Sequence, residues 1–262
     1  MLSESAQETI RNDGFCVVEN VLDQELLARV NGALQRAVDN SRKFGIATHT
    51  ETMDPNAFNV RVYNLPEHDP VFVELLAHPT ALAHVAEVLG EHFIISNFSA
   101  NIALPGSLPM NLHSDQALAV PPPWLAPWAI NIIWCLDDVN ERNGATRYLP
   151  GSHQFRTFAD VPPDAYKSTV AFEAPAGSMI AMEGRLWHTS GPNLSERDRR
   201  AMMFAYYAPD FIRPQINWEA SLSDRTKGQL DSRMRGLFGL GPVGNTRIGG
   251  GLVNLAKGKL GG

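Results

Sequence analysis

The sequence predicts an α+β domain in which helices come first and a β-sandwich or barrel follows. In the first ninety residues, apolar side chains recur at helical spacing. From about residue 91, short runs of strand-forming residues alternate with Gly and Pro turns. Apolar residues make up 44% of the chain, which is enough for a sizeable core. No repeat or linker divides it, so we expect one domain over residues 1–262, with a β core at about 91–210.

The helical half has recognisable starts and stops. Helices are expected at 3–13, 23–42 and 71–90, with a short strand at 15–21. Asp23 is a candidate N-cap, because its carboxylate can accept from free backbone amides at a helix start. Pro79 should interrupt the third helix. A loop is expected from about 43 to 59.

The β half contains runs such as "HFIISNFSANIAL", "WAINIIWCLDD", "GSMIAMEG" and "RRAMMFAYYAP". Such short strands separated by turns favour a sandwich or barrel. The segment 211–262 is mixed and ends in "GGGLVNLAKGKLGG". A Gly-rich end of this kind is a candidate lid over a pocket.

Charge and cysteine content exclude several classes of function. The net charge is −6 with no basic block, which argues against nucleic acid and anionic membrane surfaces as partners. Cys16 and Cys135 form no CxxC pair, which fits a reducing compartment. The first residues lack an apolar signal core, and no run of 18 apolar residues occurs. We therefore expect a cytoplasmic protein with a small-molecule substrate, and a homodimer is a candidate assembly.

One short motif carries the chemistry. In "NLHSDQALAV", His113 and Asp115 stand at positions i and i+2, which share one face of a strand. His188 follows in "GRLWHTSG", at the end of another strand in the same half. Two imidazoles and one carboxylate form the facial triad of non-heme Fe(II) oxygenases, which leaves three metal positions open. A structural zinc site would be closed and usually sulfur-rich.

A second feature suits the same chemistry. Arg199 lies eleven residues after His188, at the start of the next strand-like run. A guanidinium there can pair with a carboxylate through two hydrogen bonds, and 2-oxoglutarate has such a distal carboxylate. Ser190 can donate a hydrogen bond to the same group. Arg200 is adjacent, and strand alternation allows only one of the two arginines to point inward.

These residues resemble a known family. The HxD pair, the distant histidine and the arginine eleven residues later are similar to the phytanoyl-CoA dioxygenase family of Fe(II)/2-oxoglutarate oxygenases. Three further segments resemble it: "GFCVVENVLDQELL", "RVYNLPEHDPVFVELLAHP" and "DDVNERNGATRYLPGSH". The resemblance covers about residues 10–210.

The resemblance implies a fold, a set of cofactors and residue roles. The fold is a double-stranded β-helix, a jelly-roll barrel, with flanking N-terminal helices. The cofactors are Fe(II), 2-oxoglutarate and O2, and succinate and CO2 are released. The implied ligands are His113, Asp115 and His188 for iron, Arg199 for the 2-oxoglutarate C5 carboxylate, and Thr146 and Arg61 for further 2-oxoglutarate contacts. The implied reaction is oxidation, by default hydroxylation, of an unactivated C–H bond in a small, largely apolar metabolite such as a natural-product intermediate.

One departure and two rival functions remain. Natural-product relatives often carry Gln three residues before the first histidine, where this chain has Met110. Asp115 argues against a halogenase, in which a small residue replaces the carboxylate. The rivals are a non-catalytic barrel that binds a metal or small molecule, and a zinc-type hydrolase, which would need a nearby general base.

Two loops have structural as well as functional interpretations. The segment 117–128, "ALAVPPPWLAPW", is either a rigid loop or a wall of the substrate pocket. The segment 143–153 is first a pair of turns, in which His153 is expected to support the turn rather than bind metal.

Overall fold

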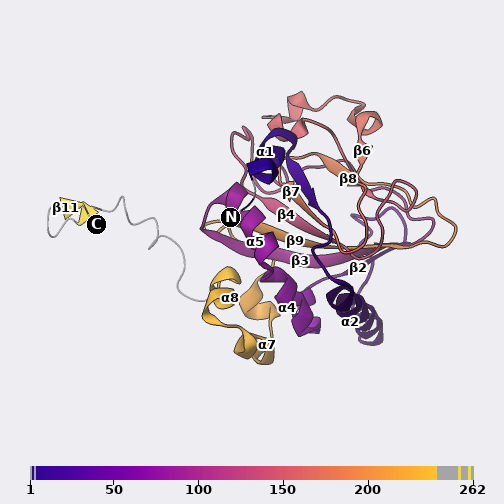
Figure 1. Cartoon of the computed structure of the whole chain (residues 1–262), viewed down its shortest axis with the longest axis horizontal. Coiled ribbons are helices and arrows are strands. Elements are labelled where there is room, and N and C mark those ends of the chain that lie inside the picture. The colour runs from indigo at the N-terminus through magenta and orange to yellow at the C-terminus, as the bar shows by residue number, and fades with distance from the viewer. Residues whose placement is uncertain (1, 3, 241–252, 255–258, 261–262) are drawn as a thin grey trace.

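The barrel is built from two antiparallel sheets, with helices covering the outer face of the larger one (Figure 1). The computed structural model describes residues 2, 4–240, 253–254 and 259–260. Most of its helical residues precede the long strands and further short helices follow them, and this mixture of helices with antiparallel sheets confirms the predicted α+β class.

The larger sheet has six strands and the smaller has three. In spatial order the six are β1 (Phe15–Val18), β7 (Met179–Glu183), β4 (Ile130–Cys135), β9 (Arg200–Pro209), β3 (Phe93–Ala103) and β2 (Asn59–Val62). The three are β6 (Val170–Ala171), β5 (Thr146–Tyr148) and β8 (His188–Ser190). Because β1 and β2 form the edges of the large sheet, the β structure extends beyond the expected segment 91–210.

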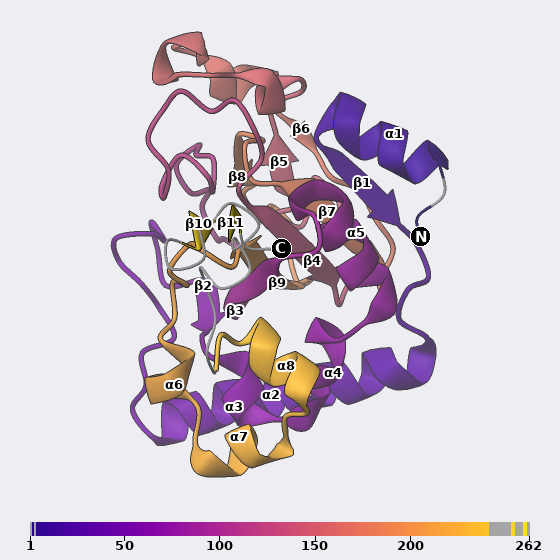
Figure 2. The ribbon, with the colours of Figure 1, turned by 90° about the vertical axis from the view of Figure 1, so that its left-hand side faces the viewer.

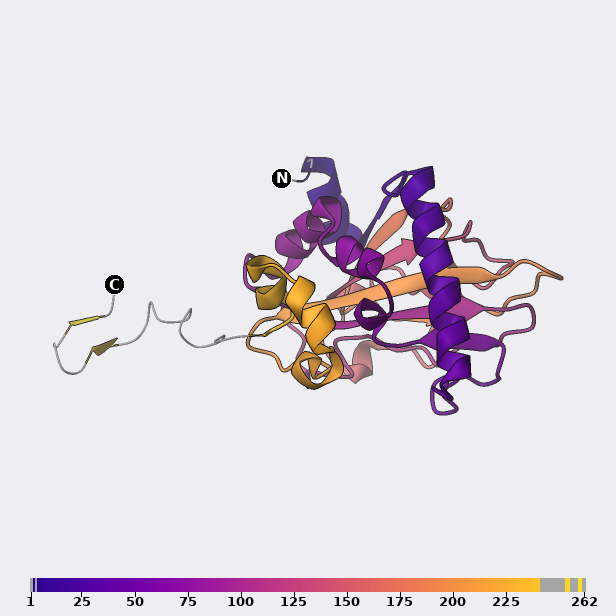
Figure 3. The ribbon, with the colours of Figure 1, turned by 90° about the horizontal axis from the view of Figure 1, so that it is seen from below.

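Figures 2 and 3 show most of the helices gathered on the side of the large sheet away from the small sheet. The α-helices are α1 (Glu4–Asp13), α2 (Gln24–Lys43), α3 (Leu65–His68), α4 (Pro70–Leu76), α5 (Pro79–Leu89), α6 (Trp218–Ser221), α7 (Asp224–Gln229) and α8 (Ser232–Leu237). The described residues also form the 3-10 helices η1 (Ser152–Gln154), η2 (Phe158–Asp160) and η3 (Ala165–Ser168), and β10 (Val253–Asn254) pairs with β11 (Lys259–Leu260).

Local sequence explains where the main helices begin. The Asp23 carboxylate accepts from the Leu26 amide at 2.8 Å and caps α2, as predicted. Pro70 and Pro79 open α4 and α5, where a missing N–H costs nothing. The predicted break at Pro79 is therefore the boundary between two helices.

The strands of the large sheet are buried on both faces. On β9, Ala201, Met203, Ala205 and Tyr207 pack in the core beneath the helices. Met202 and Phe204 belong instead to the cluster between the two sheets. Alternation therefore sends the even-numbered residues of β9 into the barrel.

A β-bulge sets the inner face of β3. The pairing of β3 with β9 shifts register between Ile95 and Asn97. A bulge inserts one extra residue and changes which side chains face inward. After it, Asn97, Ser99 and Asn101 line the barrel cavity.

The segment after β9 is anchored to the sheet up to residue 240. Trp218 of α6 is 1% exposed, and its Nε1 donates to the Ile95 carbonyl at 2.7 Å. The part of the candidate lid at 241–252, 255–258 and 261–262 lies outside the described residues, so the lid stays a prediction.

Among the described residues, no single helix has the length and hydropathy to cross a bilayer; α4 and α5 reach that threshold only jointly, as a pair bent by 46°.

Candidate active site

The structure brings His113, Asp115 and His188 together between the two sheets. His113 and His188 form an isolated antiparallel bridge, with reciprocal backbone hydrogen bonds of 2.9 and 2.7 Å. The sequence pattern placed His113 and Asp115 on one strand, but Asp115 instead lies in the turn that follows this bridge. Backbone pairing of the two histidine segments, rather than strand alternation, gathers the three side chains.

Both imidazoles are oriented by main-chain carbonyls. The Nδ1 atom of His113 lies 2.8 Å from the Asn111 carbonyl, and that of His188 lies 2.9 Å from the Leu186 carbonyl. A carbonyl only accepts, so each Nδ1 carries the proton and each Nε2 presents a lone pair. This is the usual support of metal-binding histidines.

The carboxylate of Asp115 faces both Nε2 atoms. Its Oδ1 lies 3.8 Å from each of them, and one ligand atom from each residue falls within a 4.8 Å cluster. Asn131 of β4 donates from Nδ2 to Asp115 Oδ2 at 3.1 Å and holds the carboxylate in this orientation. Among the described residues this is the one cluster of three such groups that could hold a metal ion.

Burial keeps His188 in its metal-binding protonation state. Desolvation is the main cause that lowers the pKa of His188 to about 4, and the neighbouring His113 lowers it further. Asp115 acts in the opposite direction. His188 is therefore neutral at pH 7, with its Nε2 lone pair available. Two imidazole nitrogens and one carboxylate oxygen on one side fit Fe(II) and leave the other side free.

A cavity of about 180 Å³ adjoins the triad. Its walls come from β2, β3, β4, β5, β8, β9 and the loops around residues 53, 110, 118 and 215. The lining residues are Met53, Arg61, Asn97, Ser99, Asn101, Met110, His113, Asp115, Leu118, Asn131, Thr146, His188, Thr189, Ser190, Arg200, Phe204, Tyr206 and Gln215. The barrel interior thus holds the triad, one unpaired arginine and a wall of amide side chains.

The expectation that Arg199 points inward is wrong. Its Nε donates to Asp137 Oδ2 at 3.1 Å, and a terminal nitrogen donates to Asn31 Oδ1 at 2.8 Å, outside the barrel. Arg200 lines the cavity instead. It shares the alternation of Phe204, whereas Arg199 shares that of the outward residues of β9.

Arg200 is a buried cation that lacks an acidic partner. It is 1% exposed, donates to the Gly144 carbonyl at 2.9 Å and to Asn101 Oδ1 at 2.9 Å, and has no carboxylate within 4 Å among the described residues. Desolvation, together with the charge of Arg61, lowers its pKa to about 10. A buried charge needs a counter-charge, so this side of the cavity suits a ligand carboxylate.

The other predicted contacts also line the cavity. Arg61 is already paired with the buried Asp54 through two hydrogen bonds of 2.6 and 2.7 Å. Thr146 and Ser190 stand opposite each other on β5 and β8. The Ser190 hydroxyl oxygen accepts from the Met110 amide at 2.9 Å.

Part of the loop at 117–128 is structural, and part of it lines the cavity. Trp124 is 2% exposed and packs with Trp187 in a small core cluster, so it is structural. Leu118 lines the cavity. Trp128 packs edge-on against Phe211 at 5.5 Å and is partly exposed.

Sequence reasoning did not identify Asn131 or Tyr206. Asn131 interrupts the apolar run "AINIIWC", and an amide inside a buried strand is a local inconsistency that could have marked it. Burial, reinforced by Asp115, raises the pKa of Tyr206, so its hydroxyl keeps its proton and remains a donor.

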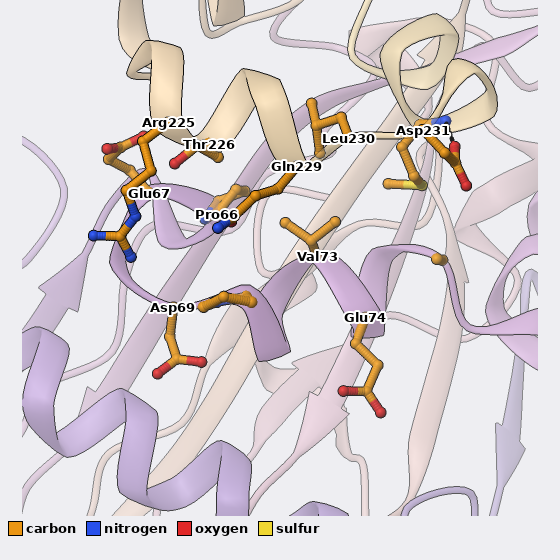
Figure 4. Close-up of a pocket in the computed structure, with 13 residues that line it drawn as sticks. Pro66, Glu67, Asp69, Val73, Glu74, Arg225, Thr226, Gln229, Leu230 and Asp231 are labelled. Carbon is orange, nitrogen blue, oxygen red and sulfur yellow. Dashed lines mark hydrogen bonds between the residues drawn. The ribbon is translucent and has the colours of Figure 1, made fainter.

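A second hollow, of about 310 Å³, lies between α4 and the α7–α8 segment (Figure 4). Its acidic groups are already engaged: Asp69 pairs with Arg36, and Glu74 pairs with Arg29. Figure 4 shows these two carboxylates pointing away from α7 and α8. The described residues of this hollow contain no set of metal ligands, so the barrel cavity is the candidate active site.

A jelly roll with two histidines and one carboxylate at its centre defines the class of non-heme iron oxygenases. The model of the phytanoyl-CoA dioxygenase (PhyH) family matches residues 10–201 of this chain. The chain therefore belongs to that family, whose members are dioxygenases dependent on Fe(II), 2-oxoglutarate and O2. Membership of this family supports the dioxygenase and argues against the two rival functions, a non-catalytic barrel and a zinc-type hydrolase.

Individual relatives agree with this assignment. The chain is 42% identical over 241 residues to dioxygenase af480 of Aspergillus fumigatus, covering 92% of this chain and 78% of the relative. The fold is similar to HygX of Streptomyces hygroscopicus, solved with nickel and 2-oxoglutarate, with a TM-score of 0.67, 16% identity and coverage of 82% and 90%. It is also similar to SnoK, a non-heme alpha-ketoglutarate-dependent carbocyclase from nogalamycin biosynthesis, with a TM-score of 0.66, 21% identity and coverage of 85% and 91%.

Proposed function

We propose that this dioxygenase oxidises an unactivated C–H bond of a small, largely apolar metabolite, with hydroxylation as the default outcome. His113, Asp115 and His188 would hold Fe(II), and Arg200 would bind the distal carboxylate of 2-oxoglutarate. The observation that carries the proposal is the buried Arg200, which lacks a carboxylate partner and lines the same cavity as the triad. A natural-product intermediate is the substrate class we infer, supported by the apolar Leu118 and Phe204 in the cavity wall and by the kinds of relatives found.

The roles of the other residues follow from their positions. When bound, Fe(II) supplies the O2-dependent oxidising chemistry, with conversion of 2-oxoglutarate to succinate and CO2. Asn131 fixes the Asp115 carboxylate, and the Asn111 and Leu186 carbonyls fix the two imidazoles. Thr146, Ser190 and Arg61 would complete the 2-oxoglutarate site.

We further infer a cytoplasmic location, supported by two buried cysteines that form no disulfide within the described part of the chain. A homodimer remains our proposal for the assembly, and sedimentation of the purified protein tests it.

Succinate formation tests the proposed function. The purified protein is loaded anaerobically with Fe(II) and given 2-oxoglutarate, ascorbate and O2, since these enzymes turn over slowly without their prime substrate. We expect iron-dependent succinate that falls about 100-fold or more in His113→Ala, because one of three ligands is lost. His92→Ala is the matched control, because His92 is exposed and does not line the cavity. No succinate together with no iron-dependent binding of 2-oxoglutarate in calorimetry would refute the proposal.

A further inference from the structure

Two polar side chains stand directly opposite each other on the inner face of the large sheet. Asn131 of β4 pairs in register with Tyr206 of β9, and both line the cavity. They are 7% and 6% exposed. Directly opposed residues on antiparallel strands have Cβ atoms about 4.5–5.5 Å apart. The carboxamide and the phenol therefore reach the same part of the cavity wall.

Chemistry fixes the orientation of the Asn131 amide. Its Nδ2 donates to Asp115 Oδ2 at 3.1 Å, and a carboxylate can only accept. The Oδ1 atom must therefore point elsewhere. It is buried and has no hydrogen-bond partner among the described residues. Buried acceptors in folded proteins are nearly always satisfied, so a donor from outside the chain is expected here.

The hydroxyl of Tyr206 is also free within the described part of the protein. The next residue shows the contrast, since the Tyr207 hydroxyl donates to the Leu76 carbonyl at 3.2 Å on the helix-facing side of the sheet. Buried tyrosine hydroxyls usually have such a partner. Tyr206 instead lines the cavity, at the strand position directly opposite Asn131.

We propose that Asn131 and Tyr206 together bind one hydroxyl group of the prime substrate. A hydroxyl both donates and accepts, so it satisfies the Asn131 oxygen and the Tyr206 O–H at once. A ketone would satisfy only Tyr206, and a hydrocarbon neither. The substrate is thus a small alcohol with an apolar body, and this identification rests on the proposed function.

The rest of the cavity suits such a molecule. Leu118 and Phe204 offer apolar surface to its carbon skeleton. Arg200 lies six residues before Tyr206 on β9, roughly 20 Å along the strand. The carboxylate of 2-oxoglutarate and the substrate hydroxyl therefore bind at opposite ends of the site. Because Asn131 also holds Asp115, the hydroxyl lies beside the triad and positions the neighbouring C–H bonds.

Matched ligand pairs test the proposal. The probes are a set of small cyclic alcohols and the hydrocarbons obtained by removing the hydroxyl. Binding is followed by ligand-observed NMR on protein loaded with Zn(II) and 2-oxoglutarate, which does not turn over. We expect alcohols to bind at least about 10-fold more tightly than their parents, because a site built around a hydrogen-bonding group rejects the analogue that lacks it. Tyr206→Phe and Asn131→Leu should abolish this preference.

Tyr207→Phe is the matched control, because it removes a buried phenol oxygen from the same strand on the opposite face. It should keep the preference for alcohols. Equal binding of alcohols and parents, a preference that survives Tyr206→Phe, or no alcohol binding at millimolar concentration would each overturn the hydroxyl site. Binding of 2-oxoglutarate is measured in the same samples and should be unchanged in Tyr206→Phe. If the wild-type protein does not bind 2-oxoglutarate, that result would instead refute the proposed function.

Discussion

At the scale of single residues, the active site depends on how buried charges are compensated. Arg61 and Arg200 both lie in the barrel wall, but only Arg61 has an acidic partner among the described residues, Asp54. The charge of Arg61 is therefore compensated inside the protein, although its side chain still lines the cavity. The charge of Arg200 is left for a ligand carboxylate.

Removing the partner of Arg61 should therefore destabilise the protein strongly. Asp54→Asn leaves a guanidinium buried without a counter-charge, and we expect the free energy of unfolding to fall by about 3 kcal/mol. Urea denaturation monitored by circular dichroism measures it. The control is Glu74→Gln, which removes one partner of the half-exposed pair with Arg29 and should change stability little. Equal effects of the two substitutions would contradict this account of Arg61.

The sequence predicted the triad residues but not the inward-facing arginine. The spacing of His113, Asp115 and His188 carries a chemical pattern that few other functions need. In "RRAMMFAYYAP", by contrast, both faces of the strand are apolar, because one packs under helices and the other lines the barrel. Alternation alone therefore could not choose between Arg199 and Arg200. The pairing of Arg199 with Asp137, which is 62 residues away in the sequence, makes Arg199 the outward-facing arginine.

At the scale of elements, close contact between β4 and β7 supports the turn that carries Asp115. Gly184 follows β7, and its carbonyl accepts from the Ser114 hydroxyl and from the Gln116 amide, each at 2.8 Å. A Cβ atom at Gly184 would lie 2.5 Å from the Ala129 Cβ and 3.0 Å from its carbonyl oxygen. Only glycine permits this approach.

Gly184→Ala should therefore weaken both fold and metal site. We expect a loss of about 1–3 kcal/mol in the free energy of unfolding from overpacking. We also expect weaker Fe(II) binding in anaerobic calorimetry, because the Asp115 turn moves with Gly184. The control is Gly228→Ala on α7, where the added Cβ atom meets open space. This substitution should leave the free energy of unfolding unchanged or raise it by up to about 1 kcal/mol. If Gly184→Ala keeps wild-type stability and metal affinity, the contact with Ala129 can relax and this prediction is contradicted.

Elements with local signals were predictable, whereas those defined by distant pairing were not. The cap at Asp23 and the break at Pro79 identified α2, α4 and α5. The short strand β2 (Asn59–Val62) falls at the end of a segment expected to be a loop, and its pairing with β3 crosses some forty residues. Four residues carry too little periodicity to reveal such an edge strand.

At the scale of the whole molecule, helices cover one face of the large sheet and the small sheet covers the other. The triad therefore lies between the two sheets, next to the cavity. The triad and an uncompensated arginine at the start of β9 make the space between the sheets a site for a metal and a dicarboxylate. The order of helices and strands predicted the α+β class, and the family resemblance implied the jelly roll. Neither showed that Asn97 and Asn101 line the cavity, because a bulge in β3 sets the face on which they lie.

The most direct test of the central claim is calorimetric titration of 2-oxoglutarate into anaerobic, Fe(II)-loaded protein carrying Arg200→Lys or Arg199→Lys. The two substitutions are chemically identical and adjacent, and melting curves confirm that each variant is folded. We predict that Arg200→Lys raises the Kd for 2-oxoglutarate about 10- to 100-fold, about 1.4–2.7 kcal/mol, because lysine cannot form the bidentate pair. Arg199→Lys should stay within about twofold of the wild type, since its pairing with Asp137 lies outside the barrel. Equal effects, or a larger effect at Arg199, would contradict the assignment of Arg200 to the co-substrate.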